Sequence, residues 1–466
     1  MFADVPMGDS QRGTVGIGGT FNALFMSTWM ILTHALTTQN IPAALLNPNH
    51  YSTIAAATRE HIAQIDSYYL PLLDDAFYGA DYLSYDGDFW RTRSPIHQID
   101  KVKAPTFITG ALQDIFQRDA GLLYEKLKQN TDTRLIIYDG DHTNHVINLF
   151  PGGSNSDPLM NLMLQWFDHY LLGMDTGIET IPAVTQYVKN ANPLLGYGYA
   201  STTDWPHPEA APERWYLHGD KTLSRYAPET AGPTDTMTTP PFAELEYYKN
   251  SNGSLLVFNV KINDGTDCSI GYRQWTLGGG AFIAGDPLNP CFYENSQIEA
   301  NALNYDSAPM EEDYYINGPI QADIWVSTTA RDAVLSVRVD EVSTKTGRVT
   351  SLSNGLLLAT ARAVDEQRSR YLQGEMIQPY HYLTKETVQP VEPGEVIKMQ
   401  VEIFPTSALI RKGNKLRVSL SPSNQAQGVL NYPQRERAKD GITTIYNSPE
   451  YPSSLVVPVV PLSALE

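Results

Sequence analysis

The 466-residue sequence predicts a chain in two parts, a mixed α/β part followed by an all-β sandwich of the jelly-roll type. Two observations predict this division. Strand-like and helix-like patterns alternate between about residues 100 and 180, as they do in parallel α/β sheets. After about residue 181 helical patterns nearly vanish, and period-two alternation of apolar and polar residues takes over.

The first helical patterns cover residues 20–36 and 53–70, and Thr53 is the predicted N-cap of the second. An acidic, aromatic loop follows at residues 74–90. Its carboxylates could attract a substrate ammonium group, although a charge-rich loop is more often simply solvated. These carboxylates belong to Asp74, Asp75, Asp81, Asp86 and Asp88.

From residue 101 the pattern is strand, helix, strand, helix. One β-type run ends at Gly110, a helical pattern covers residues 119–130, and a second apolar run leads into Asp-Gly-Asp-His at residues 139–142. The last helix has Asp157 as its predicted N-cap and Gly173 as its C-cap. A right-handed crossover would place the two strands parallel in one sheet.

The all-β part is predicted from segments that alternate apolar and polar residues. In one of them Leu335, Val337 and Val339 form an apolar face, and the intervening side chains are polar. Alternation with one polar face is typical of antiparallel sheets that pack into a sandwich. The four clearest segments are PIQADIWVS, VLSVRVDEV, IKMQVEIF and KLRVSLS.

Asp114 and His142 are the candidate catalytic residues. Each lies just past the C-terminal end of a predicted strand. In a parallel sheet these two loops lie side by side, at the edge where ligands and catalytic groups gather. A buried carboxylate beside an imidazole orients the ring and stabilises its cation. The alternative is a loop aspartate and a loop histidine that only make local hydrogen bonds.

Other residues are weaker candidates. His145 is the second-ranked imidazole, whereas His34, His61 and His169 lie in helical patterns and are interpreted as packing or surface residues. The sequence has no HExxH, GxGxxG or Walker motif, so it predicts no metal site and no cofactor. Two cysteines cannot form a zinc site alone. Cys268 and Cys291 could form a disulfide in an exported protein, or remain buried thiols.

The net charge of −19 opposes binding to nucleic acids and to anionic membrane surfaces. The most apolar window, residues 20–36, contains polar side chains and is shorter than a membrane span requires. No signal-peptide pattern opens the sequence. The compartment stays open, with a secreted or periplasmic location slightly favoured over the cytoplasm, and the oligomeric state cannot be predicted.

The sequence resembles the CocE/NonD hydrolases, which include cocaine esterase, α-amino acid ester hydrolases and X-Pro dipeptidyl-peptidases of the S15 type. The segment DFWRTRSPIHQIDKVKAPTFITGALQDIF and the later DGDHTNH carry the resemblance in the first part. The segments NYDSAPMEEDYYINGPIQADIWVS and VEPGEVIKMQVEIFPTSALIRKGNKLRVSLSPSN carry it in the second. The resemblance covers nearly the whole chain.

This resemblance implies the C-terminal part of an α/β-hydrolase domain at residues 1–19 and 96–180, a helical cap at 20–95 and a jelly-roll sandwich at 181–466. It implies that Asp114 and His142 are the acid and base of a Ser-His-Asp triad. Such an enzyme hydrolyses a small ester, an amide or a short peptide, and needs no cofactor.

The sequence departs from the family at the nucleophile, which is a serine in a G-x-S-x-G turn ahead of the aspartate. The nearest match, GDSQRG at residues 8–13, has its second glycine one position late. Ser10 is therefore an unlikely nucleophile, and we expect the serine and the early strands to be missing from this chain. A separate N-terminal complementing segment would then supply them.

A non-catalytic function is the competing hypothesis. The α/β part would be a degenerate remnant, and the jelly roll would bind carbohydrate on exposed aromatic side chains. The candidate side chains are Trp205, Trp215, Trp275 and Tyr315, although a core or interface position is the simpler interpretation of each.

Overall fold

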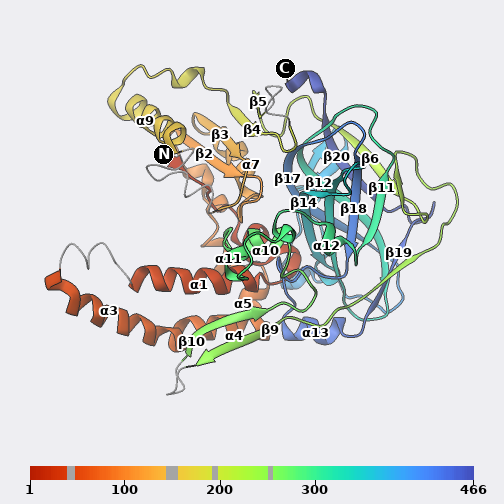
Figure 1. Ribbon diagram of the computed structural model, residues 1–466, viewed down its shortest axis with the longest axis horizontal. Coiled ribbons are helices and arrows are strands. Elements are labelled where there is room, and N and C mark those ends of the chain that lie inside the picture. The colour runs from red at the N-terminus through yellow and green to blue at the C-terminus, as the bar shows by residue number, and fades with distance from the viewer. Residues whose placement is uncertain (39–47, 143–155, 192–197, 250–254, 466) are drawn as a thin grey trace.

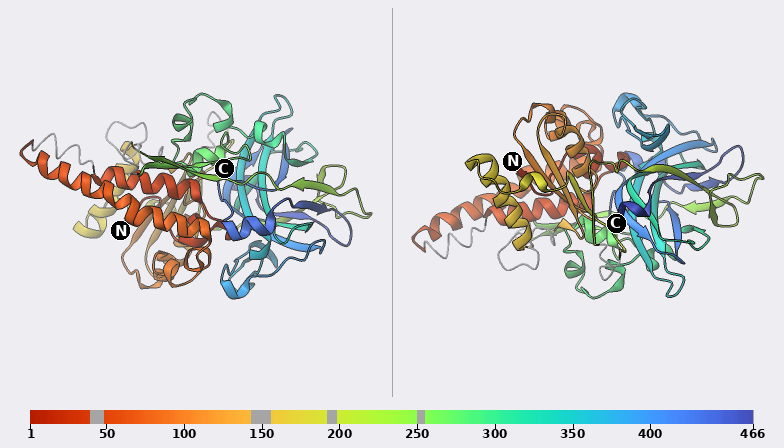
Figure 2. Two further views of the ribbon diagram at one scale, coloured as in Figure 1. Left: turned by 90° about the horizontal axis from the view of Figure 1, so that it is seen from below. Right: turned by 90° about the horizontal axis from the view of Figure 1, so that it is seen from above.

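The computed structural model describes residues 1–38, 48–142, 156–191, 198–249 and 255–465. The α/β part and the β-sandwich lie side by side, and a pair of long helices projects away from the α/β part (Figures 1 and 2). This is the two-part architecture that the sequence predicts. Within the described ranges, no helix combines the length and the apolar character needed to cross a bilayer.

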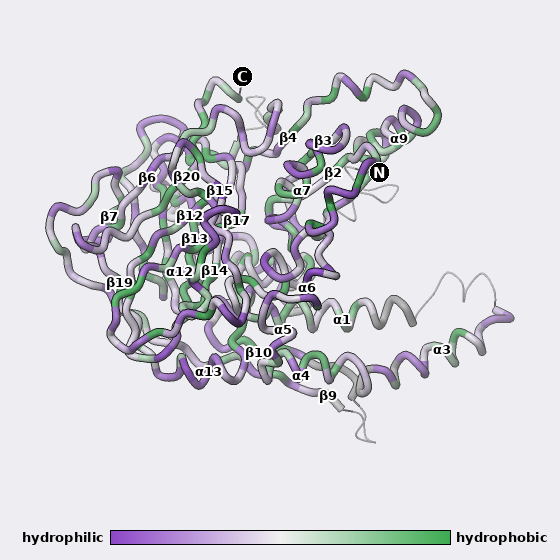
Figure 3. The backbone as a smooth tube through the Cα atoms, turned by 180° about the vertical axis from the view of Figure 1, so that it is seen from behind, coloured by the Kyte–Doolittle hydropathy of each residue, from purple (hydrophilic) through white to green (hydrophobic). Residues whose placement is uncertain are grey.

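The first sheet has the strand order β1-β2-β3-β4-β5. The first four strands are parallel, and β5 runs antiparallel to β4. The central strand β2 is buried throughout and β3 is mostly buried, which suits a sheet covered on both faces. Figure 3 colours the strands by hydropathy. The five strands are Phe2–Ala3, Thr106–Ala111, Thr133–Tyr138, Val184–Tyr187 and Tyr199–Thr202.

One helix covers each face of this sheet. Ile108 and Leu135 pack in the same core cluster as the apolar side of α7, Asp119–Leu127. Their strand neighbours Phe107 and Ile136 point to the other face. There they pack with Trp166 of α9, Ser156–Leu172, whose side chain is fully buried. The strand–helix–strand–helix prediction is therefore confirmed.

The helical projection consists of α1 and α3, followed by three shorter helices. Thr53 lies inside α3 and is not its N-cap, because the helix already begins at Tyr51. The hairpin of β9 and β10, although later in the chain, contacts α1. The helices are α1 Ala23–Thr38, α3 Tyr51–Gln64, α4 Leu70–Tyr78, α5 Asp81–Ser84 and α6 Asp88–Arg91, and the hairpin strands are Glu244–Lys249 and Leu255–Lys261.

The sandwich is built around β12, Tyr314–Thr328, which pairs with β17, β19 and β20. Its predicted apolar face, Ile320, Ala322, Ile324 and Val326, is fully buried. The other sandwich strands are β6 Ala211–Leu217, β7 Thr222–Ser224, β8 Asp235–Thr238, β11 Leu303–Ser307, β13 Val334–Val342, β14 Val349–Leu358, β17 Ile397–Ile410, β18 Lys415–Ser421, β19 Ile442–Tyr446 and β20 Ser454–Val460. A short hairpin, β15 Arg370–Leu372 and β16 Glu375–Gln378, and the helix α13, Tyr432–Ala438, complete this part.

The C-terminal part departs from the predicted boundary and has two features that the sequence did not predict. Strands β4 and β5 extend the first sheet, beyond the predicted boundary at residue 180, because β4 pairs with the edge of β3. A helical insert, residues 263–302, separates β10 from β11. The polar face of β13 is buried rather than solvated: Asp340 accepts a hydrogen bond from Asn295 of this insert, at 2.8 Å.

Candidate active site

Asp114 and His142 come together at one edge of the first sheet. Asp114 follows β2 and His142 follows β3, and these two strands are adjacent and parallel. The Nδ1 atom of His142 lies 2.6 Å from Oδ2 of Asp114. A proton on Nδ1 is therefore held by the carboxylate, which leaves Nε2 as the nitrogen that can accept a proton from a nucleophile.

The Asp114 carboxylate is held on both sides. Its other oxygen, Oδ1, accepts a hydrogen bond from the backbone N–H of Phe116 at 2.6 Å, and the residue is 1% exposed. The Phe116 ring packs edge-on against the His142 imidazole, with 5.7 Å between ring centroids. A buried carboxylate with a fixed orientation can orient the imidazole without itself moving.

The electrostatic surroundings of His142 favour its protonated form. Burial lowers the pKa of His142, but the hydrogen bond and charge of Asp114, together with the charges of Asp4 and Asp141, outweigh it and raise the pKa above its ordinary value. Asp4 follows β1 and Asp141 precedes His142 in its own loop. Three carboxylates thus favour the imidazolium form of His142.

Ser10 has a different environment. It opens a single helical turn, Ser10–Val15, and is 3% exposed. Its hydroxyl donates to the backbone oxygen of Arg93 at 2.7 Å, and its backbone N–H donates to the Ser94 hydroxyl at 3.0 Å. Between Ser10 and any described histidine the structure shows no hydrogen bond. The Ser10 hydroxyl is thus engaged with a backbone carbonyl, and its exclusion as the nucleophile stays a prediction.

The remaining histidine candidates lie elsewhere or outside the described residues. His145 and the side chain of His34 fall outside them. His61 is exposed on α3, and His169 on α9 lies 3.3 Å from Glu179 near the end of its helix. His142 is therefore the histidine that the structure joins to the candidate aspartate.

The aromatic platform of the carbohydrate-binding hypothesis is contradicted. The four candidate side chains are buried, with exposed fractions of at most 5%, so they cannot form an exposed surface. They pack in the cores because burying a large aromatic ring away from water lowers the free energy of the folded state. They are Trp205, Trp215, Trp275 and Tyr315.

Residues 74–90, which the sequence predicts as an acidic loop, lie mostly in the short helices α4, α5 and α6. Their carboxylates are largely engaged within the protein. Asp74 accepts from Tyr247, Asp75 accepts from Tyr82, Asp81 pairs with Lys385, and Asp86 pairs with Arg12. These contacts give the segment a structural role, because paired carboxylates attract a substrate cation less strongly than free ones.

Cys268 and Cys291 are joined by a disulfide within the helical insert. Among the described residues, the structure contains no cluster of three or more His, Cys, Asp or Glu side chains that could hold a metal ion.

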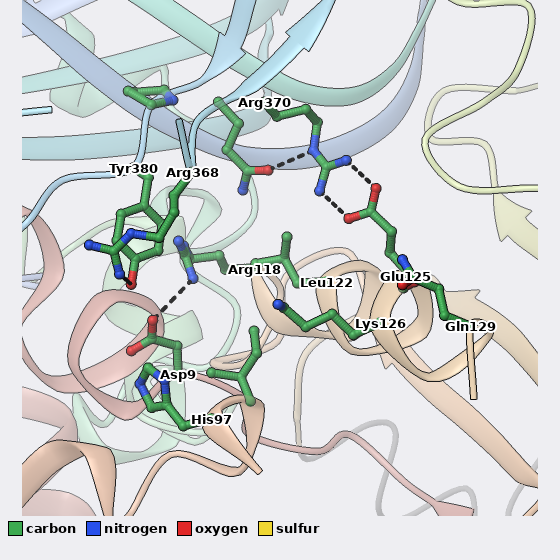
Figure 4. A pocket seen from close by; sticks show the side chains of 13 residues that line it. Asp9, His97, Arg118, Leu122, Glu125, Lys126, Gln129, Arg368, Arg370 and Tyr380 are labelled. Atoms are coloured by element: carbon green, nitrogen blue, oxygen red, sulfur yellow. Dashed lines mark hydrogen bonds and ion pairs between the residues drawn. The ribbon is translucent and has the colours of Figure 1, made fainter. Parts of the chain in front are cut away.

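A separate cavity of about 360 Å³ lies between α7 and the β15–β16 hairpin (Figure 4). Its charged side chains bind one another: Arg370 forms a bidentate pair with Glu125, and the buried Arg118 faces Asp9. The lining includes neither Asp114 nor His142. We therefore assign this cavity to the junction between the two parts of the chain rather than to the active site.

Two residues that contact the loops carrying the candidate pair were missed by the sequence analysis. Gln274 and Arg273 of the insert reach the Asp114 and His142 loops. No local pattern could have indicated them, because they are 160 and 132 residues away from their partners in the sequence.

Comparison with known proteins agrees with this geometry. The profile of the X-Pro dipeptidyl-peptidase (S15 family) matches residues 1–144, and that of the X-Pro dipeptidyl-peptidase C-terminal non-catalytic domain matches residues 176–456. The chain belongs to the CocE/NonD hydrolases of the S15 type. Both parts of the resemblance seen in the sequence are thereby confirmed.

Relatives within this CocE/NonD family extend beyond the aligned region. The chain is 25% identical over 299 residues to a Mycobacterium bovis protein named as a serine esterase; the match covers 62% of this chain and 40% of that protein. It is 21% identical over 395 residues to the cocaine esterase of a Rhodococcus species, covering 80% and 59% of the two chains. The chain thus spans less than two thirds of the length of these two relatives.

Solved structures share the fold of this CocE/NonD chain. A CocE/NonD family hydrolase from Staphylococcus aureus superposes with a TM-score of 0.63 at 15% identity, over 99% of this chain and 67% of that one. An α-amino acid ester hydrolase gives a TM-score of 0.64 at 14% identity, over 98% and 72%. These neighbours establish an α/β-hydrolase fold followed by a β-sandwich.

Proposed function

We propose that this chain supplies the aspartate and the histidine of a serine hydrolase that cleaves ester or amide bonds. The observation that carries the proposal is the 2.6 Å contact between His142 Nδ1 and Asp114 Oδ2 at the ends of adjacent parallel strands. Substrates of this class are small esters, amides or short peptides.

In the proposed reaction a serine hydroxyl attacks the substrate carbonyl carbon. His142 Nε2 takes the hydroxyl proton and then gives it to the leaving oxygen or nitrogen of the substrate, which departs as an alcohol or amine and leaves an acyl-serine. Water releases the acyl group by the same route, and the acid product leaves. Asp114 holds Nδ1 throughout and stabilises the imidazolium.

We further propose that the serine comes from a complementing segment rather than from Ser10. The Ser10 hydroxyl is bound to the Arg93 carbonyl, which supports this proposal. In the described part of the chain β1 pairs only with β2, so its outer edge offers backbone groups on which another parallel strand could pair.

The acid–base pair can be tested without hydrolytic activity. The chain contains 10 histidines, and ¹H–¹³C spectra of labelled imidazoles, compared with a His142→Gln variant, identify the His142 signal. Asp114→Asn should lower the pKa of His142, because burial then acts against a weaker stabilising partner. Asp313→Asn, which removes a partner of Arg411 in the sandwich, is the matched control and should leave this pKa unchanged.

The source of the nucleophile is tested by fluorophosphonate labelling, measured as intact mass. We expect no adduct on the purified chain, and one adduct after co-expression with an upstream-encoded segment that carries G-x-S-x-G. An adduct on the chain alone, mapped to Ser10, would refute the complementing segment. An unchanged pKa of His142 in the Asp114→Asn variant would refute the proposed pair.

A further inference from the structure

The helical insert, residues 263–302, belongs to the C-terminal part of the sequence. It contains α10 Ile270–Trp275, α11 Gly280–Ile283 and α12 Ser296–Glu299. In Figure 1 its first two helices, α10 and α11, lie between the sandwich and the α/β part, and α12 lies over the sandwich. Ser269 caps α10 by accepting a hydrogen bond from the backbone N–H of Tyr272 at 3.0 Å. This cap fixes the helix that carries the contacts described next.

Gln274 joins the insert to the Asp114 loop. Its Nε2 donates to the backbone oxygen of Asp114 at 2.9 Å and to Oε1 of Gln117 at 3.2 Å. Gln117 in turn donates to the backbone oxygen of Pro405 in β17, at 2.8 Å. Gln274 is 3% exposed, so these hydrogen bonds are shielded from water. The Asp114 loop is therefore tied to the insert and, through Gln117, to the sandwich.

Arg273 joins the same helix to the His142 loop. Its Nη2 lies 2.5 Å from Oδ2 of Asp141, the residue that precedes His142. The Asp141 carboxylate also packs against Gly278. A Cβ atom on residue 278 would clash with Oδ1 of Asp141. Asp141 is 2% exposed, and a buried carboxylate needs such a cationic partner.

Apolar packing and a covalent link hold the helix in place. Trp275 is 1% exposed and packs in one cluster with Ile115, the neighbour of Asp114. The disulfide joins Cys268, just before α10, to Cys291, beyond α11. The Arg273 guanidinium stacks over Tyr293 with 4.8 Å to the ring centroid, next to the second cysteine. The disulfide thus closes the segment whose first helix contacts both loops.

We propose that Arg273 and Gln274 are positioning residues for the Asp114–His142 pair, presented by the disulfide-closed insert. Gln274 holds the aspartate loop, and Arg273 holds the histidine loop and balances the Asp141 charge. This inference rests on the proposed function, because it assigns to the insert the task of keeping the acid and the base aligned. It is distinct from that function, because neither residue touches the reacting atoms.

The charges around His142 define the effect expected of Arg273. Asp114, Asp4 and Asp141 face the imidazole from the loops after β2, β1 and β3, and each favours the imidazolium. Arg273, from α10, pairs with one of these carboxylates and so reduces its influence on the ring. Loss of the arginine should therefore raise the pKa of His142, and loss of the Asp141 charge should lower it.

The decisive experiment measures the pKa of His142 by ¹H–¹³C NMR in variants of the full chain. Arg273→Gln should raise it and Arg273→Lys should restore most of the original value. Asp141→Asn should lower it, and this second variant tests the same balance if Arg273→Gln fails to fold. Arg214→Gln is the matched control, because Arg214 pairs with Asp323 and Glu375 in the sandwich part and should leave the signal unchanged.

Gln274 is tested by hydrogen exchange. Gln274→Leu should increase amide exchange in residues 114–118 by about tenfold, since a lost hydrogen bond of about 1.4 kcal/mol corresponds to that factor. The positioning proposal is wrong if amide exchange in residues 114–118 is unchanged and if neither Arg273→Gln nor Asp141→Asn shifts the pKa of His142. The proposed pair still stands in that case, provided that Asp114→Asn shifts this pKa. If Asp114→Asn has no effect either, the pair itself fails.

Discussion

The disulfide of the insert permits the most quantitative prediction. Cys268 and Cys291 are separated by 23 positions in the sequence. Closing a loop of this size lowers the entropy of the unfolded chain by an amount worth about 3 kcal/mol at room temperature. The double variant Cys268→Ser, Cys291→Ser should therefore lose about 3 kcal/mol in the free energy of unfolding of the part of the protein that contains the insert.

The physical basis lies in the contacts of the insert with its surroundings. Cys291 and Phe292 are each 2% exposed and pack with Ala281, so the native position of the segment does not depend on the covalent bond alone. Without the bond the native contacts remain, while the unfolded chain gains freedom. The loss should thus appear as a changed unfolding equilibrium with the native contacts of the insert still formed.

Urea unfolding followed by tryptophan fluorescence measures this change, and hydrogen exchange of residues 263–302 locates it. A reducing agent should destabilise the wild-type chain by the same amount and leave the double serine variant unchanged. A loss below about 1 kcal/mol would show that closure of this loop is not what stabilises the insert. If faster hydrogen exchange appeared only in peptides outside residues 263–302, the disulfide would not act on the insert as predicted.

The remaining predictions concern the stability contributions of His142, Gly278 and Asp119. Because the pKa of His142 is raised in the folded state, its charged form adds stability that is fully present below about pH 6.5. This stability is lost as pH rises through the folded-state pKa. The difference in unfolding free energy between the wild type and His142→Gln should therefore shrink between about pH 5 and about pH 9. Gly278→Ala, at φ 85° and against Asp141, should cost about 1–3 kcal/mol, more than Gly285→Ala at φ 75° with open space around it; equal losses in urea unfolding would contradict the contact. Burial, with the charge of a neighbouring aspartate, raises the pKa of Asp119 to about 7, so the folded state keeps a proton that the unfolded state has lost. The free energy of unfolding should therefore fall by at most about 4 kcal/mol as pH rises from about 4 to about 7. Asp119→Asn should flatten this decline, and an unchanged pH profile in the variant would refute the assignment to Asp119.

Local patterns in the sequence were sufficient to predict the elements near the active site. The apolar runs of β2 and β3 and the helical stripe of α9 have periodicities that depend only on nearby residues. The rule that adjacent parallel strands end at one edge then predicted the proximity of Asp114 and His142. The alternation of Ile320, Ala322, Ile324 and Val326 likewise predicted one buried face of the sandwich.

The sequence by itself thus determined the two-part fold and the candidate acid–base pair, because both depend on short-range periodicity and on chain order. Only the tertiary structure decided which groups far apart in the sequence come into contact. Gln274 reaches Asp114 across 160 residues, and Asn295 donates a hydrogen bond to Asp340 on the polar face of β13. Such contacts depend on how separately folded segments pack in space, and a hydrogen bond between side chains far apart in the sequence leaves no local periodicity that would reveal it.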